Sequence, residues 1–182
     1  MKVVSVNIGA RKVVNWKGKE IETGIYKYPV EEAIYLDVDH VKNDTVIDRK
    51  YHGGIDQAIY AYSENHYLYW KELYPELEWH FGMFGENLTI TNLEETTIYV
   101  GDTYKLGEAI LEVTKPRQPC MKLGLVFGTQ KILKQFWNTS KSGIYFKVLQ
   151  TGNVCKGDAL IFINRNKKAL TIAEVYQSKK TT

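Results

Sequence analysis

The sequence is poor in the features that mark secreted and membrane proteins. No apolar run among its 182 residues is long enough to cross a bilayer. The first twelve residues lack the apolar core and the cleavage site of a secretion signal. The chain has two cysteines, Cys120 and Cys155, which excludes a disulfide-rich scaffold. We therefore expect a cytoplasmic protein without membrane partners, in which both thiols are reduced.

Acidic residues are missing from one long stretch of the chain. No Asp or Glu lies between Glu112 and Asp158, whereas eight of the 24 basic residues lie there. The rest of the chain contains the other 16 basic residues and all 21 acidic residues, so positive charge is concentrated in this stretch. Such a local field gathers anionic ligands. The basic residues are spaced out and no nucleic-acid motif accompanies them, so we expect a small phosphorylated ligand and no nucleic acid. A solvated basic face is the alternative.

The rest of the composition is that of an ordinary globular chain that favours β-structure. Hydrophobic residues make up 44% of the chain, and its 13 tyrosines favour strands and half-buried surfaces. Alternating or apolar segments predict strands at residues 4–8, 19–28, 33–38, 58–62, 88–90, near 104, and at 109–114, 143–149 and 159–163. Helices are predicted over residues 64–73, capped by Ser63, and from a cap at Thr129 onward.

This pattern predicts a mainly β fold with a few short helices. Many short strands with glycine turns favour a closed or nearly closed β-barrel over residues 1–163. Residues 164–168 are interpreted as a linker. Leu170 to Gln177 could open a helix, but we expect the chain to end before that helix buries a face. Residues 164–182 would then be a short C-terminal linker and helix.

The segment Lys115–Lys122 places Cys120 among three cations and just after two of the four prolines, with no acid nearby. Proline fixes φ and removes a backbone donor, so a stiff loop is predicted here. Neighbouring Lys and Arg favour the thiolate, which is both a nucleophile and a metal ligand. Cys120 is therefore a candidate to hold or attack an anionic group, with burial as a small hydrophobe as the alternative. Cys155 is expected to be a packing residue, although a disulfide with Cys120 stays open.

A second polar cluster covers residues 48–58. Its paired glycines, Gly53 and Gly54, would let the backbone approach a ligand and offer N–H groups to an anion. Charge-assisted hydrogen bonds around such a ligand would come from Arg49, Lys50 and His52. The alternative, which the glycines alone favour, is a turn between two strands in which Asp56 accepts backbone N–H bonds.

A third patch, Gly85–Leu88, holds a carboxylate beside an amide. Glu86 is a candidate general acid or base, with a salt-bridged structural role as the alternative. His66 and His80 have no metal-binding spacing to other His, Cys or carboxylate residues. No P-loop or dinucleotide fingerprint is present. We therefore expect neither a zinc site nor a common nucleotide-binding motif.

These patches occur in an order that resembles the MOSC domain, named for the C-terminal part of molybdenum cofactor sulfurases. The segments that carry the resemblance are His52–Ala58, Gly85–Leu88, Gly101–Asp102 and Arg117–Cys120. The resemblance runs to about Ile163 and is closest to stand-alone bacterial members that look like reductases of N-hydroxylated bases. It implies a β-barrel fold and the molybdenum–pyranopterin cofactor; pyridoxal phosphate is not expected. Cys120 aligns with the family cysteine, implied to be a metal ligand in the enzymes and a sulfur carrier elsewhere.

The same resemblance implies further contacts to cofactor or substrate. The loop His52–Ala58, with Gly53, Gly54 and Gln57, and the amide of Asn87 would line the pocket. Phosphate or pterin contacts would come from Arg49, Lys50 and Arg117. The chain lacks a cysteine cluster for an iron–sulfur centre, so a separate reductase would donate the electrons. Stand-alone members often continue into a helical domain, of which this chain has at most the first helix.

Three functions follow as hypotheses. The first is an oxidoreductase for small N-hydroxylated compounds, with Cys120 as metal ligand and His52, Asp56 or Glu86 as proton donor. The second is a non-catalytic carrier that holds the cofactor or sulfur on Cys120. The third is a hydrolase with Cys120 as nucleophile, His52 as base and Asp56 as orienting acid, and no hydrolase signature surrounds the cysteine. The first two use the same residues, so the sequence does not separate them.

Overall fold

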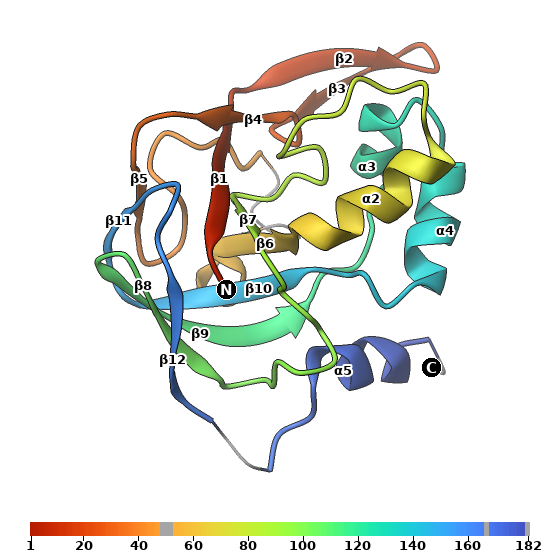
Figure 1. Cartoon of the computed structure of the whole chain (residues 1–182). Coiled ribbons are helices and arrows are strands. Elements are labelled where there is room, and N and C mark those ends of the chain that lie inside the picture. Colours follow the sequence, from red (N-terminus) through yellow and green to blue (C-terminus); the bar gives the residue numbers. More distant parts are fainter. Residues whose placement is uncertain (48–52, 166–167, 181–182) are drawn as a thin grey trace.

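A computed structural model of the chain describes residues 1–47, 53–165 and 168–180 (Figure 1). The fold is mainly β with a few short helices, as the sequence predicted. The strands are β1 Val3–Gly9, β2 Lys12–Trp16, β3 Lys19–Thr23, β4 Lys27–Val30, β5 Ile34–Leu36, β6 Ile59–Ser63, β7 Leu88–Ile90, β8 Thr103–Leu106, β9 Ala109–Pro116, β10 Ile144–Gln150, β11 Gly152–Val154 and β12 Leu160–Asn164. The helices are α2 Glu64–Leu73, α3 Met121–Val126, α4 Lys131–Asn138 and α5 Ile172–Ser178, with a 3₁₀ helix at Ile55–Gln57.

One large sheet organises the molecule. Eight strands pair in the order β12-β8-β9-β10-β6-β7-β1-β4, and two small sheets pair β11 with β5 and β2 with β3. The pairs of the large sheet are antiparallel except β6 with β7, which run parallel because α2 crosses between them. The first residues of β6 and β7 therefore lie side by side. Because β10 pairs with both β6 and β9, the residues that follow β9 lie in the same region.

The predicted barrel is not closed by continuous pairing among the described strands. β1 uses one edge to pair with β7 through Val3–Val6 and the other to pair with β4 through Val6–Gly9. Only the first residues of the chain therefore have a free edge to reach β12. They do so through an isolated bridge between Lys2 and Ala159, in which the Leu160 N–H donates to the Met1 carbonyl at 3.0 Å. The large sheet is curved and joined at a seam by a bridge, without a strand ladder.

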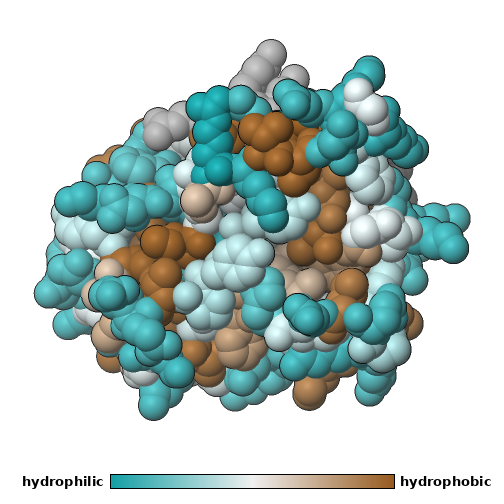
Figure 2. All heavy atoms as spheres, turned by 90° about the horizontal axis from the view of Figure 1, so that it is seen from above, coloured by the Kyte–Doolittle hydropathy of each residue, from teal (hydrophilic) through white to brown (hydrophobic). Residues whose placement is uncertain are grey.

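Hydrophobic side chains form two cores. One lies inside the curved sheet and is mostly aliphatic, with buried Val, Ile and Leu from most of its strands. The other is largely aromatic and lies between β6 and the helices α2, α3 and α4, which gather on one side of the molecule (Figure 1). Phe84 is at its centre, stacked on Tyr62 with ring centroids 4.3 Å apart. The outer surface seen from above is mostly hydrophilic, with separate hydrophobic patches (Figure 2).

The C-terminal helix α5 packs onto the main body, which corrects one expectation. Ile172 and Tyr176 are almost fully buried, and the Tyr176 hydroxyl donates to the Phe136 carbonyl at 3.2 Å. The Ala173 N–H also donates to the Glu95 carbonyl at 2.9 Å. The helix therefore does bury a face, because its partners come from α4 and from the loop after β7. The domain boundary at residue 163 stays a prediction. In the described parts of the chain, no helix is long and apolar enough to cross a membrane.

A capping box starts α5, and its removal is expected to weaken the fold modestly. The Thr171 hydroxyl accepts from the Glu174 N–H at 3.2 Å, and the Glu174 carboxylate accepts from the Thr171 N–H at 2.8 Å. Thr171→Ala should lower the free energy of unfolding by about 1 kcal/mol in a denaturant titration. The exposed Ser140→Ala change is the control and should have no measurable effect. Equal stabilities of the two variants would contradict this role of the box.

Candidate functional site

Two adjoining cavities open beside the loop that joins β9 to α3. The smaller has a volume of about 80 Å³ and the larger of about 320 Å³. They share three lining residues, Gln57, Cys120 and Tyr145. The charged residues of the smaller cavity are Lys27, Asp44, Arg117 and Lys122, and those of the larger are Lys115 and Lys179. The surroundings of the shared wall are therefore mainly cationic.

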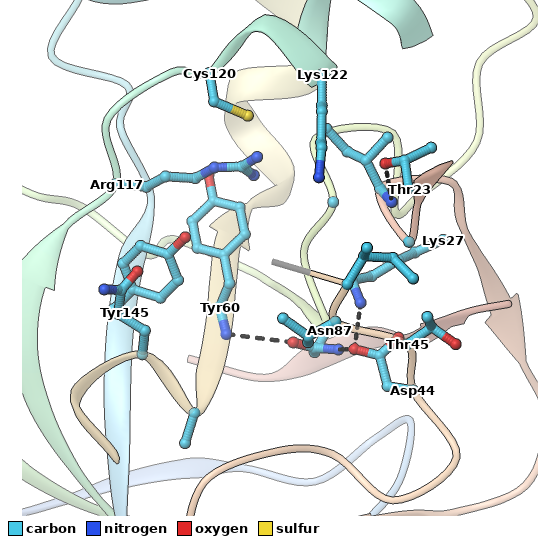
Figure 3. Close-up of a pocket in the computed structure, with 17 residues that line it drawn as sticks. Thr23, Lys27, Asp44, Thr45, Tyr60, Asn87, Arg117, Cys120, Lys122 and Tyr145 are labelled. Atoms are coloured by element: carbon cyan, nitrogen blue, oxygen red, sulfur yellow. Dashed lines mark hydrogen bonds and ion pairs between the residues drawn. The ribbon is translucent and has the colours of Figure 1, made fainter. Parts of the chain in front are cut away.

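Cys120 lies at the junction of the two cavities. It is the residue immediately before α3, in an extended backbone conformation, and it is half-buried and forms no disulfide in the described chain. Neither hydrophobic core includes it, so it does not pack as a small hydrophobe inside the fold. Figure 3 shows its sulfur beside the guanidinium of Arg117 and facing the cavity. A ligand in either cavity can reach this thiol.

Arg117 is a buried cation that is only partly satisfied. Its side chain is 6% exposed, one Nη donates to the Phe84 carbonyl, and its Cζ lies 4.5 Å from the centre of the Tyr60 ring. Its Nε is buried and has no hydrogen-bond partner among the described residues, and no carboxylate there pairs with it. Burying an unpaired charge is unfavourable. The site is therefore built for a group that brings an acceptor or a negative charge.

Three groups around Arg117 hold its proton firmly. Burial lowers the pKa of the guanidinium, but Tyr60, Tyr145 and Cys120 together outweigh this and raise the pKa above its ordinary value. Burial in turn raises the pKa of both phenols, although Arg117 opposes the shift. Arg117 is thus a permanent cation between neutral phenols. Its orientation is fixed in part by Tyr60, whose hydroxyl donates to the Ser142 carbonyl at 2.9 Å.

Opposite this group, Lys27 and Asp44 form a buried ion pair. Their side chains are 7% and 2% exposed, and the pair lines the smaller cavity. Asp44 Oδ1 accepts from the Gly9 N–H at 2.8 Å, and Oδ2 accepts from Asn87 Nδ2 at 2.9 Å. Burial lowers the pKa of Lys27, and Asp44 works against that shift. Asp44 is thus held by Gly9, the last residue of β1, and by Asn87, which precedes β7. Its partner Lys27 is the first residue of β4.

Glu86 supports the site from behind and does not line either cavity. Its carboxylate is fully buried and accepts hydrogen bonds from the Tyr67 hydroxyl, from the Gly82 N–H at 2.8 Å and from the Phe84 N–H at 3.1 Å. Burial raises the pKa of Glu86, and the bonds from Tyr67 and Gly82 oppose the shift. The carboxylate fixes the turn that carries the Phe84 carbonyl and Asn87. This placement is structural, which was one of the two predicted readings, although its partners among the described residues are hydrogen-bond donors and do not form a salt bridge with it.

The residues predicted from sequence fall into three groups. Four line a cavity, namely Cys120, Gln57, Asn87 and Arg117. Three others, Gly53, Gly54 and Asp56, are absent from both linings; Gly54 and Asp56 are exposed, and the Asp56 carbonyl accepts from the Thr114 hydroxyl at 2.7 Å. Arg49, Lys50 and His52 lie outside the described residues. The roles assigned to all of these residues stay predictions.

Several cavity residues were not singled out from the sequence. They are Lys27, Asp44, Tyr60, Tyr145 and Lys179, which come from β4, the loop after β5, β6, β10 and the end of α5. Tyr60 and Tyr145 sit in apolar strand patterns that indicate a core, and the pairing of β6 with β10 places them opposite each other. The Lys27–Asp44 pair has no local signature in the sequence, because the β1–β4 register and the loop after β5 bring the two residues together.

Similarity to known proteins identifies the family of this chain. The family model described as the MOSC domain matches residues 48–161, which include β6 to β9, part of the lining of each cavity and Cys120. The chain belongs to the MOSC domain family. Its relatives include the uncharacterized protein YflK of Bacillus subtilis, which is 36% identical over 93% of this chain and 76% of YflK.

Other MOSC relatives are longer than the matched region. A protein named reductase from Gibberella moniliformis is 37% identical, but the match covers 81% of this chain and 27% of that protein. Protein YiiM of Escherichia coli is 35% identical over 79% of this chain and 65% of YiiM. The crystal structure of YiiM from Geobacillus stearothermophilus matches with a TM-score of 0.81 and 34% identity, covering 98% of this chain and 83% of that one.

Proposed function

We propose that this MOSC protein binds the molybdenum–pyranopterin cofactor, with Cys120 as metal ligand, and reduces small N-hydroxylated compounds. The observation that carries the proposal is the half-buried thiol of Cys120 beside the buried, partly unsatisfied guanidinium of Arg117. A thiolate is a soft ligand suited to a transition metal. An unpaired buried cation next to it suits the anionic part of a phosphorylated cofactor.

The residues present fit such a group. The larger cavity, about 320 Å³, lies at the lower end of the range usual for cofactor sites, which begins at about 300 Å³. Its cations, Lys115 and Lys179, and those of the adjoining cavity, Arg117 and Lys122, would hold phosphate or pterin oxygens. When bound, the cofactor supplies two-electron chemistry that side chains lack.

The chain itself would position and polarise the substrate. The neutral phenols of Tyr60 and Tyr145 flank Arg117 and do not neutralise its positive charge. No carboxylate among the described residues pairs with Arg117, so the charge is available to a ligand in the cavity. His52 and Asp56 remain candidate proton donors, while Glu86 is sequestered in its own hydrogen-bond network. A separate reductase would supply the electrons. The Gibberella relative is named a reductase, which supports this class of activity.

Purified protein is expected to contain molybdenum when it is made in a host that synthesises the cofactor. Elemental analysis should find metal in proportion to the chain, and protein from a matched host that cannot make the cofactor should contain none. With an artificial electron donor, the loaded protein should convert a hydroxylamine to its amine. Absence of molybdenum from the first preparation would refute the proposal. Molybdenum without turnover would favour the carrier function of Cys120 over the reductase.

A further inference from the structure

The two ends of the smaller cavity differ in chemistry. In Figure 3, Cys120, Arg117 and Lys122 lie at one end, and Lys27 and Asp44 lie at the other. The first end combines a thiol with cations that have no carboxylate partner in the described chain. The second end is a buried pair with no net charge. Such a pair does not attract an anion strongly, because the carboxylate of Asp44 offsets the ammonium of Lys27.

The pair nevertheless has hydrogen-bonding capacity left over. An ammonium has three N–H donors, and Asp44 is the acceptor found for Lys27, so two donors remain for a molecule in the cavity that Lys27 lines. An ionised carboxylate offers about four acceptor positions. Those of Asp44 receive Lys27, the Gly9 N–H and the Asn87 amide, which leaves one. Spare donors next to a spare acceptor suit a neutral group that both accepts and donates.

We infer that Lys27 and Asp44 form a substrate subsite that binds the N–OH group of a neutral hydroxylamino, amidoxime or hydroxamate compound. Its oxygen accepts from Lys27 and its hydroxyl or N–H donates to Asp44. The inference rests on the proposed function for the choice of ligand class. It adds the residues that would recognise the N–OH group, and it separates this subsite from the cationic end that would hold the cofactor.

The geometry explains why the pair is held so firmly. Asp44 is fixed by the Gly9 backbone and by Asn87, and Asn87 is itself anchored because its N–H donates to the Tyr60 carbonyl at 2.8 Å. Gly9 and Lys27 face each other in the β1–β4 register. Rigid mounting of both partners keeps the donors and the acceptor at a fixed spacing, which is what discrimination between similar ligands requires.

The test is a titration of full-length protein purified without the cofactor. The probes are benzohydroxamic acid, which carries N–OH, and benzamide, which lacks the hydroxyl. Wild-type protein should bind the hydroxamate at least about tenfold more tightly, the size expected for a hydrogen bond to a charged group. The double variant Lys27→Met/Asp44→Asn removes both charges together, so no single charge is left buried, and it should lose this preference. Lys147→Met, which alters a more exposed ion pair outside the cavities, should keep it.

The titration decides the inference independently of the proposed function. A double variant that retains the tenfold preference overturns the subsite. So does a double variant that no longer loads molybdenum when the wild type does, because the pair would then belong to the cofactor site. If the double variant does not fold, ¹³C-labelled lysine in wild-type protein replaces it: hydroxamate, and not benzamide, must shift the Lys27 signal. Failure of wild-type protein to load molybdenum overturns the proposed function and leaves this titration valid.

Discussion

Cys120→Ser is expected to yield folded protein that has lost its molybdenum. Serine keeps the size of the side chain but replaces a readily ionised thiol with a hydroxyl that does not ionise near neutral pH and is therefore the weaker ligand. Even changes around a ligand typically lower metal affinity about 10- to 100-fold, so replacement of the ligand itself should exceed that range. Turnover of a hydroxylamine should fall with the metal content. Elemental analysis and an assay with an artificial electron donor would measure both.

Cys155→Ser is the matched control for this change. Cys155 is also half-buried and outside any disulfide in the described chain, but it lies between β11 and β12 and lines neither cavity. Its replacement should leave the molybdenum content and the rate unchanged. If Cys120→Ser retained both properties, Cys120 would not be the metal ligand, and the proposed function would lose its central residue.

Lys27→Met is expected to lower the free energy of unfolding by about 3–5 kcal/mol, because it leaves Asp44 as an uncompensated buried charge. The partners that remain, the Gly9 N–H and the Asn87 amide, do not neutralise a carboxylate that is 2% exposed. Urea titration would show the loss as a lower midpoint with an unchanged slope. The single variant should therefore be much less stable than the wild type.

Two comparisons separate this effect from a general loss of lysine. Adding Asp44→Asn to Lys27→Met should restore most of the stability, because no buried charge remains. Arg11→Met breaks the ion pair with Glu22, whose side chains are 62% and 44% exposed, and should change the stability by less than about 1 kcal/mol. A double variant no more stable than Lys27→Met would show that the buried charge is not the cause.

Local patterns in the sequence predicted most regular elements. Residues 64–73 and 88–90 were predicted as a helix and a strand, and α2 and β7 have those bounds. Capping was less predictable. Ser63 precedes α2 as expected, but its hydroxyl makes no capping bond and is buried without a partner in the described chain. Gln130, next to the predicted Thr129, is the cap of α4. A cap depends on side-chain rotamers that residue type alone does not determine.

The errors in the fold have one local cause and two long-range causes. The prolines before Cys120 predicted a loop through Lys122, but α3 begins at Met121, since a proline before the first turn does not prevent a helix. The burial of α5 depends on Phe136 and Glu95, which are distant in the sequence. The open seam of the sheet likewise depends on which edges of β1 are already paired.

Some residues of the candidate site could likewise be predicted from local patterns, whereas others depend on long-range contacts. Cys120 and Arg117 could be chosen from sequence because cations, prolines and the cysteine are consecutive, and both line the cavities. Lys27 and Asp44 are 17 residues apart and meet through the β1–β4 register and the Gly9 backbone. Their neighbours in sequence carry no cue to that meeting. The cationic end of the cavity was therefore predictable, whereas the neutral end required the fold.

The position of β6 has a consequence for biosynthesis. Both strands that flank it, β7 and β10, come later in the chain, and β10 ends only at Gln150. While the polypeptide emerges from the ribosome, the apolar segment Ile59–Ser63 must wait for nearly ninety more residues before its second edge is covered. An uncovered strand of this kind is a template for wrong pairing between nascent chains. Slow translation of residues 64–150 should therefore increase aggregation more than slow translation of the segment after β10.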